Sequence, residues 1–195
     1  MNLVPLFPHA GLHTNLVKNV PDDVLEKAKD VSSYFTVANS ISSNNNVLEE
    51  LSIKSLLEEK ISSYVNEVYK PKNKISVYIT ESWFSYTKTN EHHHRHSHNN
   101  SFLSGVFYVQ TLPNDVISFY RPHDTLFNIE SKEKNIFNSK DWSFPVNVGD
   151  MVLFPSYIEH YVPKNVHNDK VRISLAFNTW ISGHINSEKT VNLNV

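Results

Sequence analysis

The spacing of apolar residues changes at Pro71, and this change limits the fold more than any other feature of the chain. Before Pro71, apolar side chains recur every three or four residues, which is typical of an amphipathic helix. These residues are Leu48, Leu51, Leu56, Leu57, Ile61, Tyr64, Val65 and Val68. After Pro71, Ile75, Val77 and Ile79 occupy every second position, the pattern of a half-buried strand. The sequence therefore predicts a helical first part and a β-rich second part.

The helical part contains a second, shorter helix and a connector. Pro21 is followed by acidic residues, which complement the positive end of a helix dipole, so a short helix is predicted over about 21–30. The Ser- and Asn-rich stretch 39–46 has no periodicity and is predicted to be a loop. Asn46 with Glu49 three residues later resembles a capping box at the start of the longer helix.

The β-rich part consists of short apolar stretches separated by gaps of loop length. Further strands are predicted at 102–110, 116–120, 151–154, 160–162 and 171–180. Because no long helix is legible between them, the pattern predicts a sandwich, jelly roll or small barrel.

One long polar stretch and the chain length complete the picture of the organisation. The aperiodic stretch 121–146 is predicted to be a functional lip or lid, with disorder as the alternative. At 195 residues, we expect a single domain, 1–195, with a helical part over about 1–70 and a core over about 75–180.

The composition excludes several classes of protein. The chain has no Cys but 11 His, and its net charge is −2 with His neutral. Without Cys, disulfide scaffolds, Cys-ligated zinc, iron–sulfur clusters and thiol catalysis are excluded. The near-neutral charge gives no bulk attraction toward nucleic acid or an anionic membrane. No apolar run approaches the ~18 residues that span a bilayer, and residues 1–8 do not resemble a secretion signal.

Five of the 11 His lie within residues 92–98. His96 and His98 stand two residues apart, so in an extended backbone both imidazoles point to the same side and can bind one metal ion. A His-rich tract is a compositional sign of metal binding, and the alternative is a solvated polar loop without function. Two His leave an undefined site, so a third ligand is needed from elsewhere in the chain.

His160 and Arg172 stand at the starts of the last two predicted strands. His160 is a candidate third ligand, and a structural His bonded to a backbone carbonyl is the alternative. Arg172 and Ser174 fall on one face of an alternating strand. An inward guanidinium requires an anion, for which a carboxylate is the natural bidentate partner. The alternatives are an Arg that reaches solvent or one that pairs with a protein acid such as Asp150.

In this order, the motifs resemble those of the 2-oxoglutarate/Fe(II)-dependent oxygenases. Within that superfamily the chain is similar to the small oxygenases of bacteria and phages that are related to the prolyl hydroxylase group. The resemblance extends over about 75–180. It is carried by Ser82-Trp83-Phe84, the stretch from His96 to Tyr108, Gly149, Leu153-Phe154-Pro155-Ser156, His160, Arg172-Ile173-Ser174 and Phe177-Asn178. The resemblance implies a mainly β fold, a double-stranded β-helix (jelly roll), with the N-terminal α-helices packed outside.

The resemblance also implies an enzyme that uses Fe(II), 2-oxoglutarate and dioxygen. Decarboxylation of 2-oxoglutarate to succinate would be coupled to hydroxylation of an unactivated C–H bond, while the protein orders these events and excludes water. His96 would be the first iron ligand and His160 the distal one. Most members of the superfamily have Asp or Glu two residues after the first His, where this chain has His98. Either His98 is the third ligand, or Glu91 or another acid completes the set and His98 binds substrate.

The cosubstrate pocket is implied in the same way. Arg172 and Ser174 would hold the far carboxylate of 2-oxoglutarate through charge-assisted bonds worth roughly 1.5–3 kcal/mol each. Asn178, on the same face of the strand, would reach the near end of the cosubstrate. Tyr108 would line the same pocket.

The substrate stays open at the level of the sequence. A small molecule, a peptide or a nucleic acid is compatible, and its contacts are expected within 121–146, at Arg121, His123 and Trp142. We expect a cytoplasmic protein, in the host cytoplasm if the chain is of phage origin. No membrane partner is expected, and a homodimer is one allowed arrangement.

Two other classes of protein compete with this interpretation. Gly149, Pro155 and His160 meet the spacing of the second cupin motif, so a cupin-type metal protein is the nearest rival. The first cupin motif requires Glu four or five residues after the His pair, where this chain has Phe102 and Leu103. A non-catalytic jelly roll, such as a capsid, tail or lectin-like module, is allowed by the fold. It gives no reason for three separated His and an inward Arg to coincide.

Overall fold

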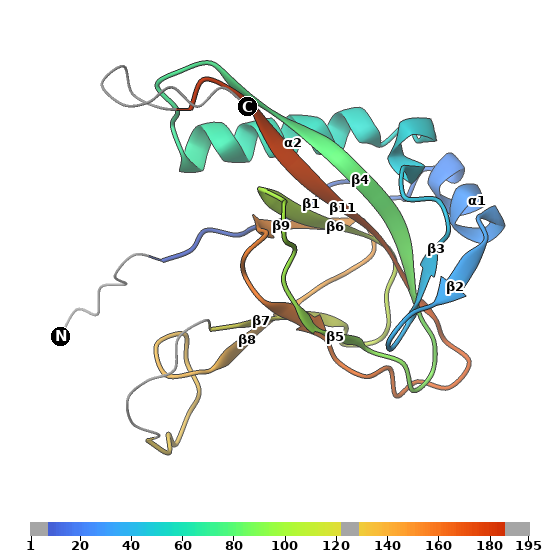
Figure 1. The fold of residues 1–195 in the computed structure, drawn as a ribbon. Coiled ribbons are helices and arrows are strands. Elements are labelled where there is room, and N and C mark those ends of the chain that lie inside the picture. Colours follow the sequence, from blue (N-terminus) through green and yellow to red (C-terminus); the bar gives the residue numbers. More distant parts are fainter. Residues whose placement is uncertain (1–7, 122–128, 186–195) are drawn as a thin grey trace.

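The computed structural model describes residues 8–121 and 129–185, and two antiparallel β-sheets dominate it (Figure 1). The larger sheet has the order β1 (Leu12–Asn15), β9 (Asp150–Pro155), β6 (Leu103–Gln110), β11 (Arg172–Gly183), β4 (Ile75–Thr87), β3 (Ser40–Ser42) and β2 (Ser33–Phe35). The smaller sheet has the order β5 (His93–His96), β10 (His160–Val162), β7 (Val116–Tyr120) and β8 (Asp141–Pro145). The two sheets face each other as in a jelly roll, which confirms the predicted mainly β class.

The helices lie outside the jelly roll, against the larger sheet. They are α1 (Asp22–Asp30), the 3-10 helix η1 (Val47–Glu50) and α2 (Lys54–Val68). Figure 1 shows α2 crossing behind the long β4–β11 pair. Within the described residues, no helix is both long enough and apolar enough to cross a membrane.

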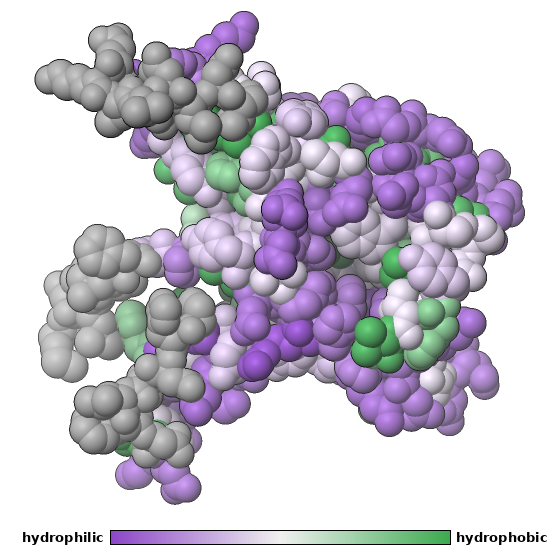
Figure 2. All heavy atoms as spheres, viewed as in Figure 1, coloured by the Kyte–Doolittle hydropathy of each residue, from purple (hydrophilic) through white to green (hydrophobic). Residues whose placement is uncertain are grey.

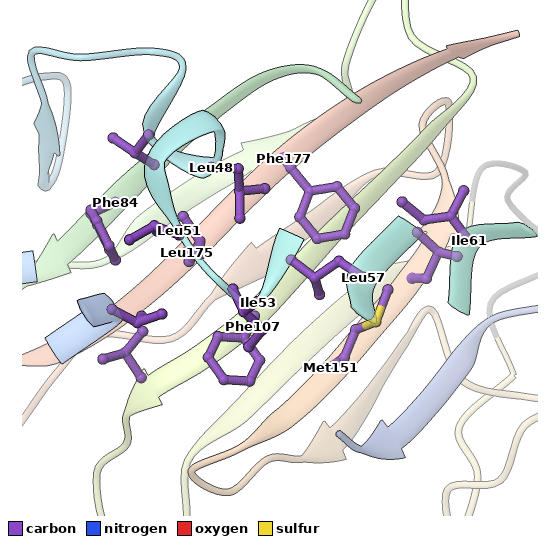
Figure 3. Packing of buried hydrophobic residues seen from close by; sticks show 14 of the residues in the cluster. Leu48, Leu51, Ile53, Leu57, Ile61, Phe84, Phe107, Met151, Leu175 and Phe177 are labelled. Atoms are coloured by element: carbon purple, nitrogen blue, oxygen red, sulfur yellow. The ribbon is translucent and has the colours of Figure 1, made fainter. Parts of the chain in front are cut away.

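The main core lies between α2 and the outer face of the larger sheet (Figure 3). The helix contributes the buried Leu57 and Ile61, and β11 contributes the buried Leu175 and Phe177. Each such side chain contributes about 1.5–3 kcal/mol by leaving water. Gly105 on β6 lies under the ring of Phe177, where a Cβ would come within 2.1 Å of a ring carbon. This close approach of strand and ring therefore requires glycine.

A second, smaller core lies between the two sheets. Its buried members are Tyr108, Ile117, Val146, Val152 and Phe154, and Val106 and Phe119 pack against them. This apolar layer leaves space on two sides. A small pocket lies on the side of β4, β5 and β11, and a larger cavity lies on the side of β1 and β8.

The predicted short helix is confirmed as α1, but the longer helix begins later than its apolar spacing predicts. A 3-10 turn, η1, precedes α2, and Leu51 between them has an extended backbone. The predicted capping box is wrong, because Asn46 makes no side-chain cap. The backbone N–H of Leu48 instead donates to Ser82 Oγ at 2.9 Å. Ser82 on β4, which is distant in sequence, thus satisfies a backbone N–H at the start of η1, where a local side-chain cap was predicted.

Residues 40–42, which lie in the predicted loop 39–46, form β3 and pair with β4. The loop prediction is wrong at these residues because backbone hydrogen bonds hold the strand, and its Ser side chains carry no apolar alternation. Similarly, β8 lies inside the aperiodic stretch 121–146 and pairs with β7. As an edge strand with mostly exposed side chains, it leaves only a weak pattern in the sequence.

The surface facing the viewer of Figure 1 is mainly hydrophilic, and hydrophobic residues gather at the end of the molecule that carries the β2–β3 hairpin (Figure 2). This hairpin exposes Tyr34, Phe35 and Val37. It is the terminal strand pair of the larger sheet and lies against the His-rich segment, since Ala38 O accepts the backbone N–H of His92.

Candidate active site

Three histidines come together at one side of the smaller sheet. His96 ends β5, His160 begins β10, and the two are direct cross-strand partners. His98 follows in the loop after β5. One nitrogen atom of each ring lies within 4.8 Å of the others. The ring centroids of His96 and His160 are 4.4 Å apart, and that of His98 lies 4.9 and 5.2 Å from them. The geometry is that of a group able to hold one metal ion.

Acidic side chains lie outside this group in the part of the chain that the structure describes. Glu91, one of the alternatives from the sequence, accepts the backbone N–H of Lys88 at 2.8 Å. Glu81 is linked to the group indirectly. Its Oε1 lies 2.6 Å from Asn178 Nδ2, which lies 3.3 Å from His98 Nδ1.

The hydrogen bonds of the rings distinguish His98 from the other two. In His96 and His160, Nδ1 lies 2.7 and 3.2 Å from the carbonyl oxygen two residues earlier. Since a carbonyl only accepts, Nδ1 carries the proton and Nε2 is left for a metal. His98 Nδ1 instead faces the amide nitrogen of Asn178 and accepts from it. For His98 to bind a metal through Nε2, this amide has to turn its oxygen toward the ring.

Burial keeps the imidazoles neutral, which is the form that binds metals. Loss of hydration lowers the pKa of His98 to about 4, and the neighbouring His96 adds to the effect. The pKa of His160 also falls well below its ordinary value, again mainly through burial. A fourth ring, that of His93 on β5, lies with its centroid 4.6 Å from that of His96, and burial lowers its pKa to about 3. The sequence indicated no role for His93, and the structure places its ring against that of His96.

The guanidinium of Arg172 points into the space between the sheets and meets an acid. Its Nε donates to both carboxylate oxygens of Asp115, at 2.8 and 2.7 Å, and its Nη2 also donates to this carboxylate. Both side chains are buried. Asp150, the acid considered from the sequence, instead accepts from His13 and Asn15 at 3.0 and 2.9 Å. No sequence motif marks Asp115, which β7 brings to Arg172 from 57 residues away.

Nη1 of Arg172 is buried and has no hydrogen-bond partner among the described residues. The same is true of Ser85 Oγ on the neighbouring strand β4. An unpartnered buried donor is costly, so both atoms mark a place where a polar ligand fits. Together with Ser174 and Tyr108, these residues line a narrow cavity that reaches His98 and His160.

Tyr108 adds a further donor to this cavity. Burial, reinforced by the charge of Asp115, raises the pKa of its phenol, so the group stays protonated.

Asn178 is placed differently from Ser174 and Arg172. Its amide is engaged by Glu81, Ser104 and His98 and does not line the cavity. Ser85 and Asp115 are site residues that sequence reasoning did not identify.

The residues named for substrate contacts lie elsewhere. Arg121 and Trp142 line the larger cavity beside β7 and β8. His123 lies outside the described residues.

A family model described as "Putative 2OG-Fe(II) oxygenase" matches residues 81–178, half of the chain. The chain belongs to this family of 2-oxoglutarate/Fe(II)-dependent oxygenases. The matched segment begins at Glu81 and ends at Asn178, so it contains all three histidines as well as Asp115 and Arg172. A search of curated proteins gives no match.

Solved structures share the fold at low sequence identity. HygX from Streptomyces hygroscopicus, solved with nickel, 2-oxoglutarate and hygromycin B, is 9% identical, with a TM-score of 0.60 over 88% of this chain and 82% of HygX. A prolyl-4-hydroxylase from Pseudomonas putida is 12% identical, with a TM-score of 0.56 over 87% of this chain and 92% of that enzyme. Another similar structure is the carbocyclase SnoK from nogalamycin biosynthesis, 12% identical, with a TM-score of 0.60 over 88% and 79% of the two chains.

The family membership settles the general activity. The protein is an enzyme, a dioxygenase that uses Fe(II), 2-oxoglutarate and dioxygen. The shared fold agrees with this, since the oxygenase structures superpose over most of the chain. The cupin interpretation and the non-catalytic jelly roll give way to the oxygenase.

Proposed function

We propose that this oxygenase binds Fe(II) through His96, His98 and His160, three imidazoles in place of two imidazoles and a carboxylate. The observation that carries the proposal is the convergence of three ring nitrogens within 4.8 Å, without an acid in the group among the described residues. The neutral state of the buried rings supports it. Two of the rings are already held with Nε2 free.

We further propose that the cavity beside this group holds 2-oxoglutarate. Arg172 Nη1 would donate to the far carboxylate, together with the hydroxyls of Ser174 and Tyr108. Asp115 occupies the other edge of the guanidinium and fixes its orientation. Asn178 remains a candidate for the near end of the cosubstrate, in addition to its contact with His98.

The polar groups of this cavity match 2-oxoglutarate, but its volume is too small for the molecule. The cavity has a volume of about 30 Å³, roughly the space of two water molecules. The five-carbon diacid therefore requires half-buried side chains at the rim of the cavity, such as Trp83, to turn outward while His98 stays with the other two histidines. The unpartnered Nη1 of Arg172 stays in place when the rim side chains move, because Asp115 holds the guanidinium.

When bound, Fe(II) and 2-oxoglutarate supply the oxidation of a substrate C–H bond by dioxygen, with release of succinate and carbon dioxide. The chain's own residues position and shield the reactants. The rings of Phe154 and Phe119 lie with their centroids 4.6 and 6.3 Å from that of His160 and keep water from this side of the site. The Arg172–Asp115 pair fixes one donor at the bottom of the pocket before any ligand arrives.

A small molecule is the proposed class of substrate. Two of the similar structures were solved with such compounds, HygX with hygromycin B and the epimerase SnoN with nogalamycin RO. At 9 and 10% identity these names support the class and not a particular compound. We propose the cytoplasm as the place where the protein acts.

The test is an anaerobic titration of the purified protein with Fe(II) and then 2-oxoglutarate. We expect a metal-to-ligand charge-transfer band and slow succinate formation on admission of air. Arg172→Gln should raise the 2-oxoglutarate concentration needed for the band at least tenfold while Fe(II) binding is kept. A wild-type protein without the band would refute the cosubstrate site, and an unchanged requirement in Arg172→Gln would remove Arg172 from it.

A further inference from the structure

A cavity of about 640 Å³ opens on the side of β1 and β8, with the rings of Phe119 and Phe154 between it and His160. One wall comes from β7, β8 and the described residues between 136 and 140. The other comes from β9 and the segment before β1. This volume falls in the range of about 300–1,000 Å³ that is usual for small-molecule sites. The lining is mostly apolar and includes Phe119, Phe137, Trp142, Phe144, Phe154 and Ile158.

The strand register places this cavity beside the metal-binding group. His96 pairs with His160, His160 pairs with Phe119, and Phe119 pairs with Trp142. Direct cross-strand partners share a face, so the four side chains form one row across the smaller sheet. Neighbouring strands are about 4.8 Å apart, which puts Trp142 about 10 Å from His160 along the row. One layer of rings, Phe119 against Phe154 with centroids 4.9 Å apart, lies between the cavity and His160.

The cavity is lined by large apolar side chains that are partly exposed to solvent. Trp142 and Phe144 are each 38% exposed, Phe137 is 46% exposed and Ile136 is 61% exposed. A cluster of exposed apolar groups around a concave site is typical of a binding surface. Aromatic rings at the wall favour a ligand that itself carries rings, because offset and edge-to-face ring pairs add to the burial of area.

The charge at the wall is set by Arg121. Its Nη1 and Nη2 donate to the carbonyl oxygens of Phe137 and Ile136 at 3.0 and 2.7 Å. These neutral partners fix the guanidinium, and no carboxylate pairs with it within residues 8–121 and 129–185. The acid in the same wall, Asp141, is engaged: it accepts from the hydroxyl of Tyr161 at 2.9 Å and lies 3.7 Å from Lys134 Nζ.

The other titratable groups of the cavity wall are His9, His13, Tyr120 and Lys140. His13 bonds to Asp150, and His9 Nδ1 bonds to the hydroxyl of Tyr157. Among the described residues of the wall, Arg121 is therefore a cation that hydrogen bonds fix next to aromatic rings. A carboxylate, sulfonate or phosphate on a ring system matches this arrangement.

We propose that this cavity binds a ring-bearing, anionic small molecule, with its rings against Trp142 and Phe144 and its anionic group at Arg121. That this molecule is the substrate rests on the oxygenase function proposed above; the binding itself requires neither iron nor 2-oxoglutarate. A substrate with its body in the cavity has to extend about 10 Å from Trp142, past Phe119, to present a C–H bond beside the histidines.

The test uses two dyes that differ in one charged group. Anilinonaphthalene sulfonate carries the rings and an anion, and N-phenylnaphthylamine carries the same rings without the anion. On the wild-type protein we expect saturable binding of the sulfonate at one site per chain, followed by dye fluorescence and by quenching of Trp. Trp142→Ala should weaken both dyes at least tenfold. Arg121→Gln should weaken the sulfonate about tenfold and leave the neutral dye unchanged, and Arg121→Lys should restore part of the loss.

Controls separate this site from the rest of the surface. Tyr34→Ala, which removes an aromatic ring 55% exposed on the distant β2 strand, should leave both affinities unchanged. In case Arg121→Gln perturbs the 136–137 turn, the salt dependence of the wild-type protein gives a second measurement. Salt screens an ion pair, so binding of the sulfonate should weaken with added salt and that of the neutral dye should not. Equal affinities and equal salt responses for the two dyes would overturn the anionic part of the proposal.

Further outcomes test the cavity and its role as a substrate site. Unchanged dye binding in Trp142→Ala would show that the dyes do not enter the cavity and would overturn the proposal. His160→Ala should lose the charge-transfer band and keep dye binding, and dye binding lost with His160 would place the dye at the histidines instead. In the anaerobic complex of the wild-type protein, saturating sulfonate dye should shift the charge-transfer band through Phe119. An unchanged band with the dye bound would overturn the role of the cavity as a substrate site.

Discussion

Strand β11 carries two kinds of side chain on its two faces. Ile173, Leu175 and Phe177 face the helices, and the last two are fully buried in the main core. Arg172 and Ser174 face the smaller sheet and line the pocket beside the histidines. Both faces are well buried. The apolar face is stabilised by the apolar surface area that it removes from water, and the polar face is stabilised by individual hydrogen-bonding and charged partners. The apolar face tolerates any well-shaped neighbour, whereas the polar face needs Asp115 at one edge of one guanidinium.

This contrast explains where ligands fit. On the apolar face, packing leaves nothing unsatisfied. On the polar face, Arg172 Nη1 and Ser85 Oγ are buried without a partner within the described part of the chain. Such atoms lower stability until a ligand supplies the missing bonds. The inner face is therefore built for binding at some cost in stability, and the outer face supplies the stability that permits it.

The largest expected effect is on metal binding. His160→Ala removes one of three converging nitrogens and should weaken Fe(II) binding by more than about 100-fold, beyond the roughly 10–100-fold loss typical for removal of a group behind a ligand. Anaerobic calorimetry measures this affinity. His92→Ala, an exposed imidazole in the same His-rich segment, is the matched control and should bind Fe(II) as the wild type does. Equal losses in the two variants would show that the segment binds metal through its composition alone.

The next largest effect is on stability, when the anion of the polar face is removed. Asp115→Asn leaves the buried guanidinium of Arg172 without a counter-charge and should lower the free energy of unfolding by about 3–5 kcal/mol, measured by urea denaturation. Replacing both partners, Asp115→Leu with Arg172→Met, should recover most of this loss, because no charge is then buried. A double variant as unstable as Asp115→Asn would mean that the pair is needed for packing and not for charge balance.

Neighbouring positions on β11 sharpen the comparison. Leu175→Ala should lower the free energy of unfolding by about 2–5 kcal/mol, since it opens a cavity in the main core. Ser174→Ala, one residue away on the other face, should change stability by less than about 1 kcal/mol but should raise the 2-oxoglutarate concentration at half-maximal activity. The two faces would not differ in kind if Ser174→Ala proved as destabilising as Leu175→Ala.

The smallest effect is on the pH dependence of the metal-free protein. Burial lowers the pKa of His93 to about 3, whereas an unfolded His titrates near 6.5. The unfolded state therefore binds the proton first as pH falls. Stability is full above pH 6.5 and declines below it, by about 1.4 kcal/mol for this group one unit lower. His93→Gln should remove this share of the decline between pH 7.5 and 5.5 in urea denaturation. A decline as steep as that of the wild type would show that His93 is already charged in the folded protein.

The apolar pattern predicted those parts of the fold in which one face of an element meets the core. The spacing of two residues in 75–79 and in 171–180 becomes β4 and β11, and α2 is visible through its stripe of Leu and Ile. Edge strands escaped this reasoning. Strands β3 and β8 are held by backbone hydrogen bonds to their neighbours, which leave no trace in the order of side chains.

The residues of the candidate site also fall into two groups, those that the sequence indicated and those that only the structure revealed. His96 and His98 stand close in sequence, and the resemblance to a family of oxygenases pointed to His160, Arg172, Ser174 and Tyr108 as well. The geometry then added Asp115, Ser85 and His93, and it turned Asn178 toward His98. Such partners depend on strand register, which brings residues more than fifty positions apart into contact.

By itself, the sequence determined the class of fold, the nitrogen and oxygen character of the metal chemistry, and the residue types available to it. These follow from local rules, namely the period of apolar residues, the absence of Cys and the two-residue step between His96 and His98. Only the tertiary structure decided which acid compensates Arg172, which donor atoms stay free for a ligand, and that a cavity lies one ring beyond His160. The physical reason is that charge compensation and empty space are properties of surroundings, and the surroundings of a side chain exist only once the two sheets face each other.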